Sequence, residues 1–368
     1  MSETDSEESP ADEDTGKEEK QDADADAGTV PVGVKLGSTR TVIVYPSPDG
    51  EGTEVIRTLT CLATYEDVLS GEERVLYGEE AATEYPDTVE FMLRSGLPED
   101  EDSAESAATF FNELIAANDV PENSAVVYAI PTIDNDAGLS NLESVVEGSS
   151  IGEELVRSYP ESLCGSLPAF EDGLSAIDDI FVAINMGSTN LEVCTYRRGE
   201  QLVPLSTGSI TGNEVDRRIA NYVEEETQGR VNIDLTTARE YKEEHADFES
   251  FEPFTDVIQQ PGGGSHEFTI EDSVMDACDE YVDAVVDEVA NSFLPELANS
   301  YMKVYQIALD KPIVLTGGMA CLPGIVEEVE ARLSEELQRD VTVTRSERPD
   351  LAAAEGAHEI AAHLASNL

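Results

Sequence analysis

Positive charge is scarce in this sequence. Only 21 of its 368 residues are Lys or Arg, against 79 Asp or Glu, so the formal net charge at pH 7 is -58. Because a nucleic-acid backbone is bound by clustered Lys and Arg, this composition argues against DNA or RNA as a direct partner. Hydrophobic residues still make up 40% of the chain, which is a globular value. Repulsion between the carboxylates is screened near 1 M salt, where the Debye length is about 3 Å, so we expect a salt-adapted protein.

Closely spaced cysteines and long apolar runs are also absent. The cysteines are Cys61, Cys164, Cys194, Cys278 and Cys321. They lie far apart and form no CxxC pair, which favours buried, reduced thiols over disulfides or a metal site. No apolar run approaches the roughly 20 residues of a membrane helix, and the N-terminus is too acidic for a secretory signal peptide. We therefore expect a soluble, cytoplasmic protein that does not insert into a membrane.

Residues 1–28 differ in composition from the rest of the chain. This segment, "MSETDSEESPADEDTGKEEKQDADADAG", is acidic and of low complexity. Such a composition cannot bury enough apolar surface to fold, and we expect a disordered, solvated tail. From Thr29 onward the pattern changes to strand and helix signals.

One supersecondary pattern occurs twice. "VGVKLGSTRTVIVY" and "VAINMGSTNLEV" each predict a strand, a Gly-Ser-Thr turn and a second strand, which indicates two related α/β halves. Glycine lets the backbone approach phosphate oxygens closely, and Ser or Thr adds short hydroxyl donors. A third loop, "LTGGMACLPGI", follows an apolar strand and opens a helix. Two matched loops facing each other suit a polyphosphate held from both sides.

Several segments are predicted as helices. "TGNEVDRRIANYVEEETQG" ends at a glycine, and "TTAREYKEEHADF" is expected to start at a threonine N-cap. "EDSVMDACDEYVDAVVDEVANSFLPEL" has the apolar spacing of one long amphipathic helix. "LSNLESVVEGSSIGEELVRSY" is expected to be helical in part, with a break near its glycines, and the chain ends with a small-residue helix.

In this order, the motifs resemble those of the actin superfamily, most closely bacterial MreB and actin. The two Gly-Ser-Thr loops resemble the phosphate loops of the family, and "LTGGMACLPGI" resembles its adenosine motif. "YPESLCGSL" is similar to the helix that connects the two domains, while "ITGNEVDRRI" and "TAREYKEE" resemble stretches beneath the adenosine. The resemblance runs from about residue 30 to the end. It implies an α/β, two-domain actin-like ATPase fold, with duplicated ribonuclease-H-like halves around a nucleotide cleft. The acidic composition indicates a haloarchaeal homologue.

The implied domain plan returns the chain to its first domain at the end. Domain I is expected over residues 29–160, with a small subdomain near 59–86. Domain II is expected over 161–335, with a small subdomain near 208–270. Residues 336–368 are expected to return to domain I.

The resemblance also implies the site residues for ATP. Glu161 falls where the family places the residue that orients the attacking water, and a carboxylate can accept a proton from that water. Gly317 and Gly318 match glycines whose backbone lies against the nucleotide. The residues implied at the β- and γ-phosphates are Gly37, Ser38, Thr39, Gly187, Ser188, Thr189 and Asn190. The residues implied around the ribose and adenine are Gly212, Glu214, Lys242 and Glu243.

Plainer interpretations of these residues stay open. Glu161 is one glutamate in a glutamate-rich chain, where a solvated position is common. Lys242 and Glu243 equally suit an exposed pair on a charged helix. We leave Asn213 and Asp216 unassigned.

Two positions depart from the family. Lys35 and Asn185 stand where the family has the aspartates that hold magnesium through its water shell, so no residue is assigned as a metal ligand. Three explanations are open. Lys35 itself contacts the β- and γ-phosphates; or Mg²⁺ binds through phosphate oxygens and water alone; or hydrolysis is lost and a nucleotide-binding switch remains. We favour a combination of the first two.

The implied function is that of a cytoskeletal subunit. Its partner is then a second copy of the chain in a filament that binds ATP and hydrolyses it slowly, with unidentified adaptor proteins possible. Cell shape, polarity and DNA partitioning are equally compatible tasks. The alternative is a non-polymerising nucleotide-binding protein, such as a membrane or division adaptor or a small-molecule kinase. The terminal "EIAAHLASNL" lacks the cations and large apolar side chains of a membrane-binding helix, and we find no Asp-base motif of a kinase.

Overall fold

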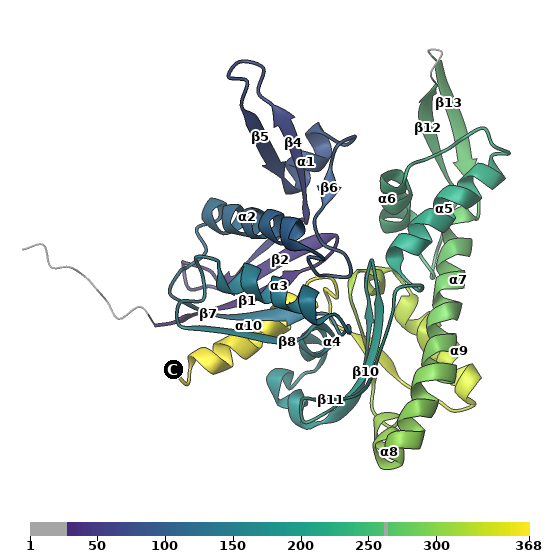
Figure 1. The fold of residues 1–368 in the computed structure, drawn as a ribbon. Helices are drawn as coiled ribbons and strands as arrows, with labels where there is room; N and C mark the ends of the chain where they lie inside the picture. The colour runs from purple at the N-terminus through teal and green to yellow at the C-terminus, as the bar shows by residue number, and fades with distance from the viewer. Residues whose placement is uncertain (1–27, 261–263) are drawn as a thin grey trace, which may run out of the picture.

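Two five-stranded sheets with the same plan form the frame of the molecule (Figure 1). A computed structural model describes residues 28–260 and 264–368, so the predicted acidic tail lies outside the described residues apart from Gly28. The strand orders are β3-β2-β1-β7-β8 and β11-β10-β9-β14-β15. In each sheet the central strand pairs antiparallel with the next strand of the chain and parallel with a later one. The repeat predicted from the two glycine loops is therefore present in the fold.

The first sheet carries helices on both faces and a small sheet above it. Its strands are β1 (Val30–Leu36), β2 (Arg40–Pro46), β3 (Thr53–Leu59), β7 (Ser124–Ile130) and β8 (Leu155–Pro160). Its helices are α2 (Glu101–Ala117), α3 (Asp136–Glu147) and α10 (Ala352–Ala365). The small sheet contains β4 (Cys61–Glu66), β5 (Glu73–Tyr77) and β6 (Glu90–Phe91), next to α1 (Gly78–Glu84).

The second sheet follows α4 (Glu161–Ser166), which connects the halves. Its strands are β9 (Ile180–Met186), β10 (Leu191–Arg197), β11 (Glu200–Thr207), β14 (Ile313–Thr316) and β15 (Val343–Arg345). Its helices are α7 (Ser273–Asp287), α8 (Leu294–Ala308) and α9 (Ile325–Leu337). The upper part contains α5 (Gly212–Glu226), α6 (Leu235–His245) and the hairpin β12 (Phe254–Gln260) and β13 (Gly264–Ile270). β9 is apolar apart from Asn185, because both of its faces are covered.

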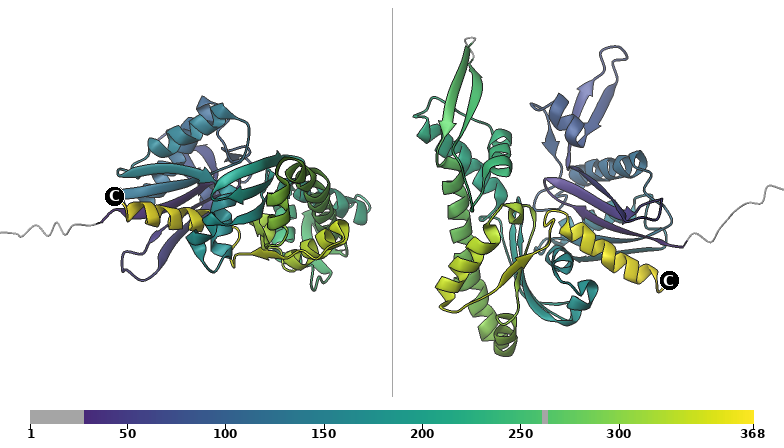
Figure 2. Two further views of the ribbon diagram at one scale, coloured as in Figure 1. Left: turned by 90° about the horizontal axis from the view of Figure 1, so that it is seen from below. Right: turned by 180° about the vertical axis from the view of Figure 1, so that it is seen from behind.

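Glycine allows α10 to lie directly on its neighbours, as the view from behind in Figure 2 shows. A Cβ at Gly33 of β1 would lie 2.2 Å from the carbonyl oxygen of Ala354. A Cβ at Gly356 would lie 1.9 Å from the carbonyl oxygen of Cys164 in α4. Backbone-to-backbone contact at both positions fixes the last helix against the first domain and the connecting helix.

The structure differs from the sequence-based expectations at three elements. The return to the first domain starts later than residue 336, because β15 pairs with β14 in the second sheet. α6 begins at Leu235 rather than at a threonine cap, because the Asp234 carboxylate accepts the Thr237 N–H at 2.7 Å. The segment 155–160, expected within a partly helical stretch, is strand β8.

The long amphipathic helix expected from the sequence is present in the described residues. The long amphipathic segment is helical throughout, although a π-helical turn at Glu288–Phe293 separates α7 from α8. All five cysteines are free thiols, four of them buried. Among the described residues, no helix is both long and apolar enough to cross a membrane.

Candidate nucleotide site

A cavity of about 320 Å³ opens between the two halves, beside both glycine loops. The predicted residues that line it are Lys35, Gly37, Ser38, Thr39, Glu161, Gly187, Ser188, Thr189, Asn190, Gly212, Lys242, Glu243 and Gly318. The predicted residues outside its lining are Asn185, Glu214 and Gly317. Residues from across the whole chain therefore meet at one cavity.

The two glycine loops touch each other across the cavity. The Ser38 hydroxyl lies 3.0 Å from the Thr189 hydroxyl, and the Thr39 hydroxyl donates to the Ser188 oxygen at 2.8 Å. Each loop is closed in the same way, since its glycine N–H donates to the carbonyl oxygen three residues on. Four hydroxyl groups, two from each half, thus share one place and can donate to oxygens of an anion instead of to one another.

Lys35 points at Glu161. Its ammonium nitrogen lies 2.6 Å from the Glu161 Oε1, and the two side chains are only 15% and 12% exposed. Lys35 extends from β1, while Glu161 opens α4, so the ion pair joins the first sheet to the connecting helix. An ammonium group has three N–H donors, and the ion pair occupies one of them. Lys35 can therefore contact an anion in the cavity without releasing Glu161.

Glu192 lies behind this ion pair and is completely buried. Its Oε1 accepts the Asn190 side-chain amide at 2.6 Å, it is hydrogen-bonded to the Thr132 backbone, and its Oε2 has no partner in the described structure. Burial, and then the negative charge of Glu161, raise the pKa of Glu192 to about 8, while Lys35 opposes the shift. Lys35 thus forms an ion pair with Glu161, and its charge also stabilises the ionised form of Glu192.

Asn185 lies opposite Glu192 in the β9–β10 ladder, so both side chains project from the same face of the sheet. The Asn185 Oδ1 is buried and has no partner among the described residues. Within the described residues no three His, Cys, Asp or Glu side chains are grouped to hold a metal ion. An ammonium group and an amide do not form a carboxylate cage for Mg²⁺.

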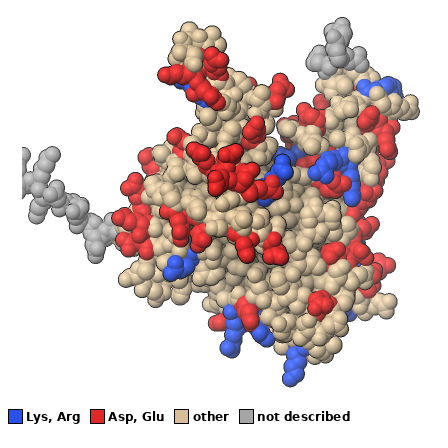
Figure 3. All heavy atoms as spheres, in the orientation of Figure 1, with Lys and Arg blue, Asp and Glu red and all other residues tan. Residues whose placement is uncertain are grey.

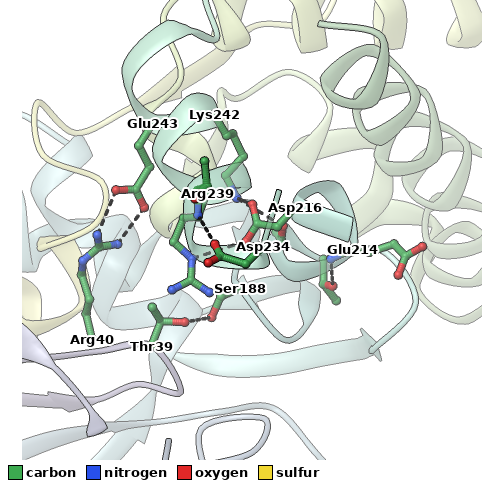
Figure 4. A network of polar contacts seen from close by, with 12 residues as sticks. Thr39, Arg40, Ser188, Glu214, Asp216, Asp234, Arg239, Lys242 and Glu243 are labelled. Atoms are coloured by element: carbon green, nitrogen blue, oxygen red, sulfur yellow. Dashed lines mark hydrogen bonds and ion pairs between the residues drawn. The ribbon is translucent and has the colours of Figure 1, made fainter. Parts of the chain in front are cut away.

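A bidentate ion pair bridges the cavity at its outer side (Figure 4). The guanidinium of Arg40, directly after the first loop, donates to both carboxylate oxygens of Glu243 on α6 at 3.0 and 2.9 Å. The hydrogen bonds to Arg40 lower the pKa of Glu243, although burial opposes this change and is the largest single influence. Arg239 of the same helix lies 5.9 Å over the Phe91 ring of β6. Helix α6 is therefore tied to the first half at two points.

Lys242 is held within the second half rather than free in the cavity. Its ammonium group contacts the Asp216 carboxylate and donates to the Gly212 carbonyl oxygen at 3.2 Å. Arg239 contacts the other Asp216 oxygen at 3.4 Å. Asp216 is only 1% exposed. Lys242 and Arg239 neutralise its charge, and these ion pairs join α5 to α6. Glu214 instead faces outward and pairs with Arg217 and Arg218.

The double glycine loop follows β14. Gly317 has a φ of +90°, which disfavours any residue with a side chain, and its N–H donates to the Pro349 carbonyl oxygen at 3.1 Å. A Cβ at this position would lie 2.7 Å from the Asn185 Oδ1. Nothing lies within 4 Å of a Cβ built on Gly318, which borders the cavity. Gly317 therefore allows the backbone conformation of the loop, and the missing side chain at Gly318 leaves the cavity open on this side.

Sequence reasoning missed several residues at the cavity or behind it, and four of them are the charged residues described above. They are Arg40, Glu192, Asp216 and Arg239. Arg40 and Glu192 lie just after the two glycine loops. A charged residue among apolar strand residues at this place could have indicated a site residue. Asp216 and Arg239 lie on acidic, charged helices, where no local pattern separates them from surface residues.

Solved structures share this two-domain architecture. MreB5 of Spiroplasma citri bound to ADP superposes with a TM-score of 0.73 at 17% identity, over 92% of this chain and 98% of that chain. MamK in a double helical filament superposes with a TM-score of 0.72 at 17% identity, over 91% and 99% of the two chains. The protein therefore has the two-domain actin-like fold, as its loop motifs predicted.

Sequence comparison identifies the family within this class. The model of the Salactin family matches residues 29–365. The chain is 65% identical over 352 residues to Salactin of Halobacterium salinarum, covering 96% of this chain and 97% of that protein. The protein belongs to the Salactin family, and the resemblance to the actin superfamily is confirmed.

Proposed function

We propose that this protein is a cytoskeletal subunit that binds ATP in its interdomain cavity and assembles with further copies into filaments. The contact between the two glycine loops carries the proposal. Their four hydroxyl groups come from both halves and meet at one cavity. A polyphosphate that replaces these contacts is held by both domains, and its binding is thereby coupled to their relative position.

The phosphates are then held by loop 37–39 and loop 187–190, whose glycines leave the backbone N–H groups accessible. Lys35 supplies the positive charge that carboxylate-held magnesium would otherwise place there, and its ion pair orients Glu161. Mg²⁺ would be held through phosphate oxygens and water, and it would neutralise phosphate charge. In this proposal Glu161 accepts a proton from an attacking water, and we expect slow hydrolysis.

Assembly into filaments is supported by likeness of fold. One structure with this fold is a MamK double helical filament, and the ADP- and AMPPNP-bound MreB5 structures bind nucleotide. Head-to-tail contacts between unlike surfaces extend without closing, which is how one globular subunit forms a filament. Cytoplasmic location and adaptor proteins stay predictions.

Nucleotide binding is tested by calorimetric titration of ATP in molar KCl. We expect one ATP per chain for the wild type and at least tenfold weaker binding for Gly187→Val. The valine Cβ would lie 2.8 Å from the Asn190 carbonyl oxygen, so the loop would have to change shape. Gly264→Val, at an exposed position of the β12–β13 hairpin with nothing within 4 Å of a Cβ, is the matched control and binds as the wild type. Unchanged binding by Gly187→Val, or none by the wild type, contradicts the proposal.

The role of Lys35 is tested by phosphate release from ATP in the same buffer, with wild type and Lys35→Asp. If Lys35 neutralises phosphate charge in place of Mg²⁺, the wild type releases phosphate without added Mg²⁺. Lys35→Asp then releases phosphate only with added Mg²⁺. ATP binding without phosphate release by the wild type would leave a nucleotide-binding switch as the explanation.

A further inference from the structure

Positive charge is concentrated at the interdomain cavity. Five of the 21 Lys and Arg residues line it, against four of the 79 Asp and Glu residues. Figure 3 shows Lys and Arg at the base of the hollow between the two upper parts of the molecule, while Asp and Glu are scattered over most of the rest of this face. In so acidic a chain, this concentration of cations suits an anionic ligand. The cations are Lys35, Arg40, Arg57, Arg239 and Lys242.

Three of these cations form ion pairs within one half of the molecule. Arg239 and Lys242 both contact Asp216 and so stay within the second half. Arg57 of β3 lies 3.1 Å from the carboxylate of Asp350, just before α10, and stays within the first half. These pairs keep their geometry when the two halves move relative to each other.

The other two cations reach from the first half to residues outside it. Lys35 contacts Glu161 at the start of α4, where the chain crosses between the halves. Residues at this crossing separate least when the halves rotate. Arg40 instead contacts Glu243 on α6, at the outer side of the cavity (Figure 4). Rotation that opens the cavity would therefore break the pair of Arg40 with Glu243 first.

The Arg40 side chain has a donor left over for a ligand. Its two terminal nitrogens donate to both carboxylate oxygens of Glu243, at 3.0 and 2.9 Å. Its Nε is buried and has no partner among the described residues, although Arg40 directly follows loop 37–39 and lines the cavity. A buried N–H without an acceptor is unfavourable, so an anion that accepts from it gains affinity.

This contact suits a protein that works in concentrated salt. The side chains of Arg40 and Glu243 are 27% and 43% exposed, so both are partly buried. Partly buried pairs are screened much less by salt than charges far apart on the surface. Two parallel hydrogen bonds also fix the geometry of the pair, which a lysine in place of the arginine could not do.

We propose that Arg40 and Glu243 form a strap across the cavity that determines how long a nucleotide stays bound. The terminal nitrogens of Arg40 hold Glu243, and the Nε donates to an oxygen of the bound nucleotide. Release requires the strap to open, because α6 must move away from the first half. This inference rests on the proposed function, since it concerns release of the nucleotide from the same cavity.

The strap is tested by the rate of nucleotide release in molar KCl. The probe is 1,N6-etheno-AMPPNP, a fluorescent ATP analogue that is not hydrolysed, chased with excess unlabelled ATP at a protein concentration too low for assembly. Glu243→Gln and Arg40→Gln should each release the probe at least about tenfold faster than the wild type. The matched control is Glu200→Gln, which loses an ion pair with Arg197 at the β10–β11 turn and should release the probe as the wild type does.

The double variant separates a strap from two independent ligands of the nucleotide. If the strap is one unit, adding Glu243→Gln to Arg40→Gln should change the release rate by less than about twofold. If Glu243 contacts the nucleotide by itself, the two effects multiply to about 100-fold, and the strap is wrong. Arg40→Lys keeps the charge without the two-pronged contact and should release the probe nearly as fast as Arg40→Gln. Release by Arg40→Lys at the wild-type rate would also contradict the strap.

The outcomes distinguish the strap from the proposed function. If the wild type binds ATP in calorimetry and the strap variants release the probe at the wild-type rate, the strap is wrong and the proposed function stands. If the folded wild type binds no ATP, both are wrong. Circular dichroism checks that every variant folds.

Discussion

Lys35 determines the charge balance at the bottom of the interdomain cavity. It is the cation closest to Glu161 and opposes the raised pKa of Glu192, and all three groups are mostly or fully buried. Removing one member of such a cluster leaves charge without compensation in a poorly solvated place, which costs more than the pair itself contributes.

Lys35→Met should therefore lower the free energy of unfolding by about 3 kcal/mol. Adding Glu161→Gln to Lys35→Met should recover part of that loss, since the double variant no longer buries an unpaired carboxylate there. Chemical denaturation in molar KCl measures both. A loss below about 0.5 kcal/mol, as for an exposed ion pair, would contradict the burial of this cluster.

Glu192 predicts a dependence of stability on pH. Its pKa is raised to about 8 in the folded protein from an ordinary value near 4.5, so the folded state binds more protons between these two values. Stability from this group is therefore present at low pH and is lost as the pH rises through about 8. Relative to wild type, Glu192→Gln should gain thermal stability from pH 5 to pH 9 in molar KCl. Parallel melting curves across this range would show that Glu192 does not titrate in this way.

The sequence predicted the parts of the site that are local. The glycine loops are recognisable because turn, strand and hydroxyl donors lie within a few residues. The ion pairs of Lys35 with Glu161 and of Arg40 with Glu243 join residues far apart in the chain. Nothing in either local pattern indicates its partner, because only the packing of the two halves brings them together.

At the scale of elements, α10 is the helix most closely bound to its surroundings. Gly356→Ala would place a Cβ 1.9 Å from the Cys164 carbonyl oxygen, so α10 and α4 must separate. We expect a loss of about 1–3 kcal/mol of unfolding free energy, measured by chemical denaturation. Gly208→Ala is the matched control, because its nearest neighbour, the Thr189 carbonyl oxygen, lies 3.8 Å away. Equal stability of the two variants would contradict the close packing of α10.

Element boundaries were predicted less well than element types. The duplicated strand-loop-strand units and the long amphipathic helix were found because their apolar periodicity is regular. β8 is only half buried and has no clear alternation, whereas the strand at β15 was expected from "DVTVTR" and only its place in the second sheet was not. The sheet that each joins is decided by partners far along the chain. The N-cap of α6 was misplaced because an aspartate just before the threonines competes for the same role.

At the scale of the whole molecule, the net charge of -58 sets the conditions under which the fold is stable. The Debye length grows from about 3 Å in 1 M salt to about 10 Å in 0.1 M salt, so carboxylate repulsion reaches across neighbouring elements on dilution. We expect the helical circular dichroism signal to fall on dialysis from molar KCl into dilute buffer and to return on restoring salt. An unchanged spectrum in dilute buffer would contradict salt adaptation.

The central claim is that nucleotide in the interdomain cavity drives assembly of this protein. Sedimentation of the purified full-length chain in molar KCl, with and without ATP, tests it most directly. We predict that the protein pellets as filaments with ATP and stays in the supernatant without it, and that Gly187→Val stays in the supernatant in both cases. Wild-type protein that stays monomeric under all these conditions would contradict the claim.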